Sequence, residues 1–384
     1  MWPIPYKFII TGFFLLSIIC FAGFKNLNTF TPPEVDVKNH VADKLHELKG
    51  VTKALQTTVV NKTAGLPSIQ KKFFTLREIY KEVEFLICYL DAEVGEHFNG
   101  ANLVSGDPDI LSTKMIEPRG MQVMEEILFS DEEEKDLTAM AVLCTQMLED
   151  ITLFEKQLNK TPITTTMLFD ASRKEVLRIA FLGLTGFDSP VAKNSIPEAI
   201  TALQAVQKVI KAYSASIQNE KLLNDVNNTF EEAILYLQKN TDFNSFDRAH
   251  FIREYSNVLY SMLLDVHNAV GAVYPETLTD FNIPVNYEAR NPFSENFLNA
   301  HFYNSNKTDN PTDARIVLGK TLFFDPVLSV NTKRACASCH QPGKAFTDGL
   351  AKSLALDFSG TVKRNAPTVI NAALQGSYFY DVRA

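Results

Sequence analysis

The sequence has little of the alternation between apolar and polar residues that half-buried strands require, and it contains no internal repeat or low-complexity tract. These absences argue against a sheet or repeat architecture. A basic excess is missing too, because 37 Lys and Arg residues stand against 45 Asp and Glu residues, with both signs mixed along the chain. That balance argues against a phosphate-binding surface, so we expect no nucleic acid partner.

Cysteine is also scarce. Two of the five cysteines stand in CASCH, residues 336–340, whereas Cys20, Cys88 and Cys144 lie far upstream. A structural zinc site at the motif would need two more ligands nearby, and a thioredoxin-like pair expects an α/β fold. Covalent haem uses the whole motif, since two thiols add to the vinyl groups and the histidine reaches the iron. We therefore predict haem c on Cys336 and Cys339, with His340 as proximal ligand.

The upstream cysteines fit a different role. Cys144 lies on an apolar helical stripe and Cys88 adjoins one, so we expect both to be small core residues, with a mutual disulfide as the alternative.

Strong ligands for the second axial position of the iron are missing near the motif. No methionine follows Met262 and no histidine follows His340. An electron carrier closes this position with such a ligand, whereas a catalyst leaves it open. Only His301 could close the iron locally, so we predict an open, reactive haem.

The N-terminus carries one lysine ahead of an apolar run from Phe8 to Phe24. This layout is typical of a secretory signal, so residues 1–24 are interpreted as a cleaved signal peptide or an uncleaved membrane anchor. We accordingly expect an exported, periplasmic protein, either released or anchored to the membrane.

Helical periodicity dominates the region that we interpret as a bundle domain, residues 40–270. Its clearest stripe contains Leu137, Met140, Cys144, Met147, Ile151, Phe154 and Leu158, and a second contains Phe73, Leu76, Tyr80, Val83, Ile87 and Leu90. Ser130 with Glu133, and Ser195 with Glu198, have the spacing of capping boxes at helix starts. Proline and asparagine interrupt any period in residues 271–310, which we interpret as a linker, and a haem domain follows at residues 311–384.

Four ordered segments carry a family resemblance: LGKTLFFDPVLS (318–329), CASCHQPGKAFTDG (336–349), KRNAPTVINA (363–372) and FYDVRA (379–384). Together they resemble the N-terminal, peroxidatic haem domain of bacterial di-haem cytochrome c peroxidases, a family that includes the tryptophan-tryptophylquinone maturation enzyme. The implied fold class is all-α, a helical bundle followed by an incomplete cytochrome c-like domain.

The resemblance also implies functional residues and partners. Asn365 matches an asparagine that helps to bind an interdomain calcium, and Tyr380 stands at the place of a tryptophan that relays electrons between haems. The implied substrate is hydrogen peroxide, and the implied electron donor is a small cytochrome c or cupredoxin. SLALDFSGTVKRN, 353–365, lacks the histidine that blocks the haem in many members, so we expect no need for reductive activation.

In the family, FWDGRA is followed by a glutamine, a glutamate and a second haem domain, whereas this sequence stops at Ala384. We therefore expect a truncated chain that turns peroxide over poorly, with a second haem c in a longer gene product.

Within the bundle, EPRGMQVMEEILF (117–129) is similar to a motif of imelysin-like domains of periplasmic iron-uptake proteins, where Gly-x-His-x-x-Glu is typical. Gly120 and Glu125 match it, but Gln122 replaces the histidine, so we expect a packing role for this segment. The leading prediction is a periplasmic c-type cytochrome-c peroxidase. The alternatives are a c-type electron-transfer protein or subunit, and an iron- or haem-related binding module built on the bundle.

Overall fold

The computed structural model describes residues 31–106, 115–275, 283–303, 311–330, 332–355, 357 and 359–375. These residues are mostly helical, which confirms the predicted all-α class. The sheet structure among them is one antiparallel pair of two-residue strands, β1 (Ser105–Gly106) and β2 (Met115–Ile116). The predicted signal or anchor, residues 1–24, lies outside the described residues.

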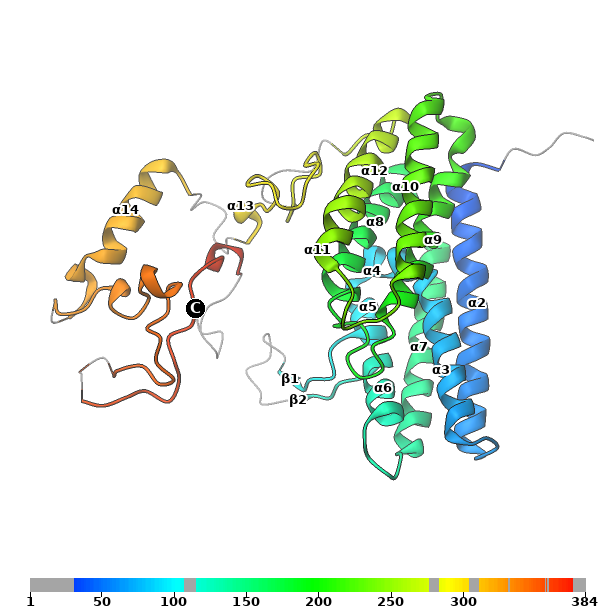
Figure 1. Ribbon diagram of the computed structural model, residues 1–384, viewed down its shortest axis with the longest axis horizontal. Helices are drawn as coiled ribbons and strands as arrows, with labels where there is room; N and C mark the ends of the chain where they lie inside the picture. The colour runs from blue at the N-terminus through cyan, green and yellow to red at the C-terminus, as the bar shows by residue number, and fades with distance from the viewer. Residues whose placement is uncertain are drawn as a thin grey trace, which may run out of the picture.

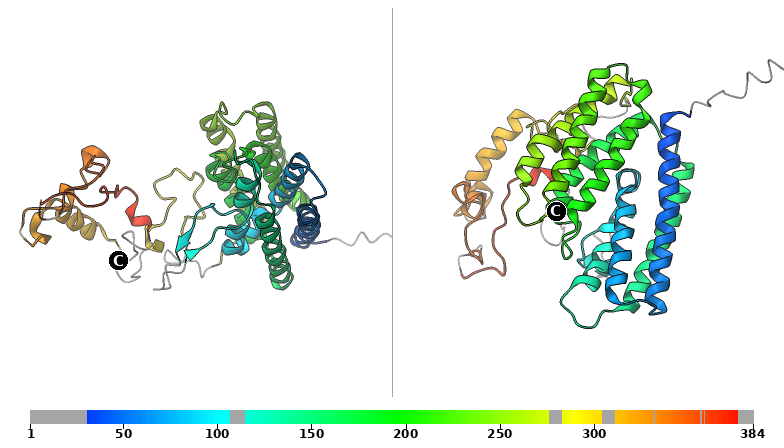
Figure 2. Two further views of the ribbon diagram at one scale, coloured as in Figure 1. Left: turned by 90° about the horizontal axis from the view of Figure 1, so that it is seen from below. Right: turned by 45° about the vertical axis from the view of Figure 1, so that its right-hand side comes forward.

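The larger part of the structure is a bundle of helices that lie side by side in all three views (Figures 1 and 2). In chain order its elements are α2 (Pro33–Val60), α3 (Leu66–Lys81), α4 (Glu84–Leu90), α5 (Ala92–Asn99), α6 (Met121–Phe129), α7 (Leu137–Lys160), α8 (Thr165–Arg178), the π-helix η2 (Ile179–Gly183), α9 (Ser195–Ala212), the 3-10 helix η3 (Ser214–Ser216), α10 (Glu220–Lys239), α11 (Arg248–Phe251), the π-helix η4 (Ile252–Ser256) and α12 (Asn257–Ala269).

The core forms where apolar stripes of neighbouring helices meet. Helix α2 begins at a proline whose fixed φ suits the first helical turn, and it buries a stripe from Val37 to Val59 against α7 and α3. Helix α7 buries its predicted stripe from Met140 to Leu158. By length and composition α7 is the helix among the described residues that could cross a membrane, but here its stripe packs inside the bundle.

The predicted start of α7 was wrong. Ser130 ends helix α6, and α7 begins seven residues later, where the Asp136 carboxylate accepts hydrogen bonds from the backbone N–H groups of Thr138 and Ala139. The spacing of Ser130 and Glu133 fits a capping box, but the chain there forms an acidic loop between two helices. Asp136 caps the helix as a capping box would, because its carboxylate accepts hydrogen bonds from backbone N–H groups of the first turn.

The capping box predicted at the start of α9 was also wrong, although the helix does begin at Ser195. Asn194 is the N-cap residue, and the Glu198 carboxylate binds the buried Arg77 guanidinium instead of the backbone. The second predicted stripe is buried from Phe73 to Ile87, and Leu90 is half-buried. The stripe is split between two helices, because α3 ends at Lys81 and α4 begins at Glu84.

Part of the segment predicted as a linker packs against the bundle. The buried Arg173 of α8 donates from Nη1 to the Tyr287 carbonyl at 2.5 Å and from Nη2 to the Ala289 carbonyl at 2.6 Å. Phe297 is also buried, with its ring edge-on to that of Tyr260 in α12. The proline-rich composition correctly indicates irregular backbone, but an irregular segment can still bury side chains when a helix supplies donors for its carbonyls.

The C-terminal part contains short elements that are drawn in yellow to red in Figure 1. They are α13 (Ala300–Tyr303), α14 (Asp313–Phe324) and the 3-10 helices η5 (Pro326–Leu328), η6 (Cys336–Ser338), η7 (Pro342–Lys344) and η8 (Ala372–Leu374). Among the described residues from 311 onward, the buried side chains are those of Asp348, Ser353 and Ala366. This part therefore builds almost no apolar core from its own described side chains, and large apolar residues such as Leu328 and Val330 stay exposed.

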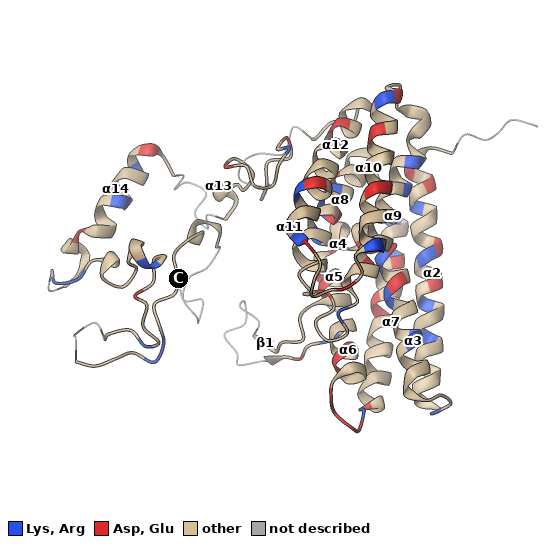
Figure 3. Ribbon diagram, in the orientation of Figure 1, with Lys and Arg blue, Asp and Glu red and all other residues tan. Residues whose placement is uncertain are grey.

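Charged residues of both signs are interspersed along the helices of the bundle (Figure 3). The loop before α7 carries the acidic run Asp131 to Glu134, which is exposed. Such mixing gives surface ion pairs of small individual value, for example between Lys221 and Asp225.

Candidate functional site

The CASCH motif folds into a single turn that brings its three reactive side chains to one cavity. Backbone N–H groups of Cys339 and His340 both donate to the Cys336 carbonyl, at 3.2 and 3.0 Å, which closes the turn. The cavity has a volume of about 520 Å³. Its lining consists of Asp325, Leu328, Ser329, Val330, Arg334, Ala335, Cys336, Cys339 and His340. A volume of this size, with apolar walls and few polar groups, suits a bound cofactor.

The imidazole of His340 is held by one hydrogen bond. Its Nδ1 lies 3.1 Å from the Phe346 carbonyl oxygen, which can only accept, so in the neutral imidazole Nδ1 carries the proton and Nε2 keeps its lone pair. Ala345 and Phe346 both have positive φ, at 53° and 58°, so the backbone makes an uncommon left-handed turn that aims this carbonyl at the ring. A histidine that ligates a metal usually donates its other nitrogen to a carbonyl or carboxylate in this way.

Helix α14 and Arg334 both contact the segment that contains the motif. The Phe346 ring packs edge-on against that of Phe323 in α14, with the centroids 5.9 Å apart. The Arg334 guanidinium donates to the Ala355 carbonyl at 2.7 Å and lies 3.6 Å from Cys339 Sγ. Sequence reasoning missed Arg334 and the Phe346 carbonyl. The position of Arg334, two residues before Cys336, could have indicated a role for its charge. No residue type at Ala345 or Phe346 predicts a left-handed turn there.

The remaining predicted site residues are not among those that line this cavity. Asn365 is exposed and is not part of the cavity lining, and Tyr380 lies outside the described residues. His301 lies in α13, where its backbone N–H donates to Asn299 Oδ1. In the part of the chain that the structure describes, no group of three or more His, Cys, Asp or Glu side chains is arranged to hold a metal ion.

Cys88 and Cys144 are free thiols in the bundle and form no disulfide with each other. Burial raises the pKa of each thiol to about 12, with the nearby Glu84 adding to the effect at Cys88. They are therefore protonated near neutral pH and behave as small core side chains, as predicted for this pair.

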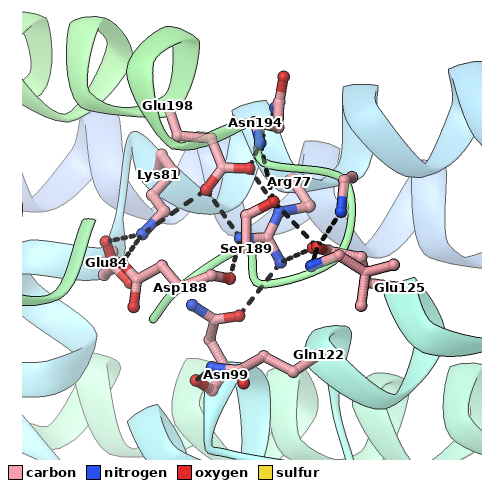
Figure 4. A network of polar contacts seen from close by, with 12 residues as sticks. Arg77, Lys81, Glu84, Asn99, Gln122, Glu125, Asp188, Ser189, Asn194 and Glu198 are labelled. Carbon is pink, nitrogen blue, oxygen red and sulfur yellow. Dashed lines mark hydrogen bonds and ion pairs between the residues drawn. The ribbon is translucent and has the colours of Figure 1, made fainter. Parts of the chain in front are cut away.

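Residues 117–129 of the bundle contribute to a buried polar network (Figure 4). The fully buried Glu125 carboxylate accepts from Ser189 Oγ at 3.0 Å and from the backbone N–H groups of Val191 and Ala192 at 2.9 and 2.7 Å. Gln122 Nε2 donates to the Asn99 carbonyl at 3.0 Å. These side chains serve internal hydrogen bonds, and Glu125 anchors the loop that precedes α9.

The backbone conformation at residue 120 requires glycine. Its φ is 88°, and a Cβ atom there would lie 2.3 Å from the His97 carbonyl oxygen, so no other residue fits without rearrangement.

The centre of the network is a set of charged side chains that sequence reasoning did not identify. Arg77 forms a two-pronged ion pair with Glu198, at 2.5 and 2.7 Å, and Lys81 binds Glu84 and Asp188 at 2.7 and 2.6 Å. All five side chains are buried. The available signal was the interruption of the stripe on α3 and α4 by residues of opposite charge three or four positions apart.

Comparisons with known proteins concern the C-terminal part of the chain. Residues 313–384 match the family model of di-haem cytochrome c peroxidase. The methylamine utilization protein MauG of Paracoccus denitrificans is 44% identical over 75 residues, which are 18% of this chain and 19% of that protein. Cytochrome-c peroxidase IdrP2 of a Pseudomonas species is 47% identical over 77 residues, 20% of each chain. Cytochrome c551 peroxidase of Pseudomonas aeruginosa is 40% identical over 67 residues, 17% of this chain and 19% of that protein. The chain thus spans about a fifth of the length of these relatives.

Proposed function

We propose a haem enzyme function on the premise that residues 313–384 belong to the di-haem cytochrome c peroxidase family, as their sequence motifs predicted. Family membership implies haem c as the cofactor. In the proposal, Cys336 and Cys339 hold the haem through two thioether bonds and His340 Nε2 ligates its iron. The observation that carries the proposal is the hydrogen bond from His340 Nδ1 to the Phe346 carbonyl, because it leaves Nε2 available inside the cavity that both thiols line.

Residues of the chain fit this cofactor in three ways. The Phe346 carbonyl fixes the tautomer and the plane of the imidazole, which makes His340 a better donor to a metal. Leu328 and Val330 supply exposed apolar walls that a large planar ring can cover. The Arg334 guanidinium lies beside Cys339 and ties the motif to residue 355, so the second thiol is held in place.

The proposed reaction is the reduction of hydrogen peroxide to water with electrons from a small redox protein, a cytochrome c or a cupredoxin. It is supported by the relatives named as cytochrome-c peroxidases, each of which is matched over only about a fifth of its length. Haem c supplies the redox centre for this reaction. In the proposal Tyr380 relays electrons, Asn365 contributes to a calcium site, and the N-terminal segment directs the chain to the periplasm.

A pair of double variants tests the proposal. Cys336→Ala with Cys339→Ala removes the two motif thiols, whereas Cys88→Ala with Cys144→Ala removes two thiols of the bundle. Haem absorbance and the rate of peroxide-dependent oxidation of a reduced cytochrome c are measured for each. We expect the first pair to lose the haem absorbance and the slow turnover expected of this chain, and the second pair to keep both. Peroxide turnover that persists without the motif thiols contradicts the proposal.

The electron-transfer alternative gives a different spectroscopic result. An open iron position makes the ferric haem high-spin, and its absorption band shifts when cyanide binds. A low-spin ferric spectrum that ignores cyanide, and that becomes high-spin in His301→Ala, would instead assign the chain to electron transfer.

A further inference from the structure

Glu175 of α8 occupies an unusual position in the bundle. Its side chain is 2% exposed, and neither of its carboxylate oxygens has a hydrogen-bond partner among the described residues. It lines a small cavity together with Ser195, whose buried hydroxyl oxygen also has no partner there. The cavity measures about 10 Å³, which is close to the space that one water molecule needs.

The backbone next to Glu175 makes room for this cavity. Helix α8 passes at residue 179 into the π-helix η2, whose wider turn places Ile179 and Gly183 in the cavity wall. Buried empty cavities are normally apolar, so a cavity with two unpartnered polar groups indicates a polar occupant.

The charges around the cavity leave Glu175 without a cation. Glu84 and Asp188 are each bound by both Lys81 and Arg178, at distances of 2.6 to 3.1 Å. The remaining cation of the network, the buried Arg77, is held by Glu198. An ionised Glu175 would therefore be a buried charge with no ion-pair partner, placed among carboxylates that are already paired.

We propose that this cavity is a binding site for one proton and one water molecule, in which Glu175 is a neutral carboxylic acid. The acid donates its proton in a hydrogen bond to the water, and the water donates in turn to Ser195 Oγ. The protonated oxygen of Glu175 and the Ser195 hydroxyl oxygen then each have a partner, and no bond is broken in the folded chain. The site goes beyond the proposed haem chemistry and does not depend on it.

The groups that face Glu175 decide how it titrates. The pKa of Glu175 is raised well above 4.5, chiefly by burial of the carboxyl group. The negative charges of Glu84 in α4 and of Asp188 raise it further, whereas Arg178 and Lys81 oppose the rise. Cys88 of α4 is neutral near pH 7 because burial raises its pKa to about 12, and α9 contributes Ser195 and the paired Glu198.

A raised pKa in the folded chain means that the folded state holds a proton which the unfolded state releases. The stabilising contribution is complete below about pH 4.5 and is lost as the pH rises through the folded pKa. The bundle is thereby coupled to the pH of its surroundings: alkaline conditions remove the proton and weaken the packing of α8 between α4 and α9.

The experiment counts protons released on thermal unfolding of the full chain, by calorimetry in buffers of different ionisation enthalpy near pH 7. Glu175→Gln keeps the size and hydrogen-bonding capacity of the side chain but cannot release a proton. We expect the wild type to release more protons than this variant, by up to one per chain. Glu126→Gln, at an exposed position on α6, is the matched control and should release as many protons as the wild type. Between about pH 5 and 9 the melting temperature of Glu175→Gln should also fall less steeply than that of the wild type.

Equal proton release by the wild type and Glu175→Gln would overturn the proposal. So would stabilisation by sodium or potassium relative to choline at equal ionic strength that disappears in Glu175→Gln, since a cation would then be the occupant. If Glu175→Gln does not fold, Glu175→Met provides the same comparison, because an apolar side chain of similar volume tolerates burial without a proton.

Discussion

Replacement of Arg77 tests whether the polar network stabilises the bundle. The guanidinium is fully buried and makes four hydrogen bonds, two to Glu198, one to Asn99 Oδ1 and one to the Asp188 carbonyl. Arg77→Met fills similar space but leaves the Glu198 carboxylate with Lys81, 4.0 Å away, as its nearest cation. Breaking a buried ion pair from one side costs about 3–5 kcal/mol. We expect a loss of that size in the free energy of unfolding.

The assay is urea unfolding of the full chain followed by far-ultraviolet circular dichroism, which reports the helices of the bundle. Arg253→Met is the control, because that side chain is 71% exposed and its ion pair with Glu254 is worth little. The double variant Arg77→Met with Glu198→Leu removes both charges together. It should be more stable than the sum of the single changes predicts, by about 1–3 kcal/mol. A loss below about 1 kcal/mol in Arg77→Met, or strict additivity in the cycle, would refute the reasoning.

Three further predictions concern the bundle. A fragment covering residues 31–303 should be more stable toward urea than one covering 31–275, because the shorter fragment removes the carbonyls that the buried Arg173 binds; equal midpoints would contradict this. Asp136→Ala should lower the free energy of unfolding by about 1 kcal/mol and Ser130→Ala by clearly less, since Asp136 is the N-cap of α7. A larger loss for Ser130→Ala than for Asp136→Ala would contradict this and would favour the capping box at Ser130. Burial alone would raise the pKa of Glu84, but Lys81 and Arg178 hold it down, to about 2, so its stabilisation is present above pH 4.5 and is lost toward pH 2. Glu84→Gln should flatten this acid limb of the stability curve, and an unchanged limb would contradict the assignment.

Sequence reasoning succeeded where local pattern and burial coincide. The stripe from Met140 to Leu158 lies in one helix and is buried along its length. An apolar face that follows the helical period is stabilised only when it packs against other apolar side chains, so the pattern alone predicts burial. The CASCH motif also carries its own geometry, since a single turn suffices to bring Cys336, Cys339 and His340 to one cavity.

It failed where a distant partner outweighs a local preference. Glu198 has the spacing of a capping residue, yet Arg77, 121 positions away, offers it a buried two-pronged ion pair that is worth more than a backbone N–H at a helix end. The segment after residue 282 has the composition of a linker, yet Arg173 of α8 binds two of its carbonyls. Neither partner can be read from the sequence around these residues, because the contact exists only once the helices pack.

Covalent attachment of haem tests the central claim most directly. The full chain is produced in a bacterium that attaches haem c to exported proteins, extracted with acidified acetone and digested, and the peptide containing residues 336–340 is weighed by mass spectrometry. The account predicts that the colour stays with the protein and that this peptide carries the added mass of one haem through Cys336 and Cys339. Haem that extracts completely, with both thiols of the peptide free to react with an alkylating reagent, would contradict it.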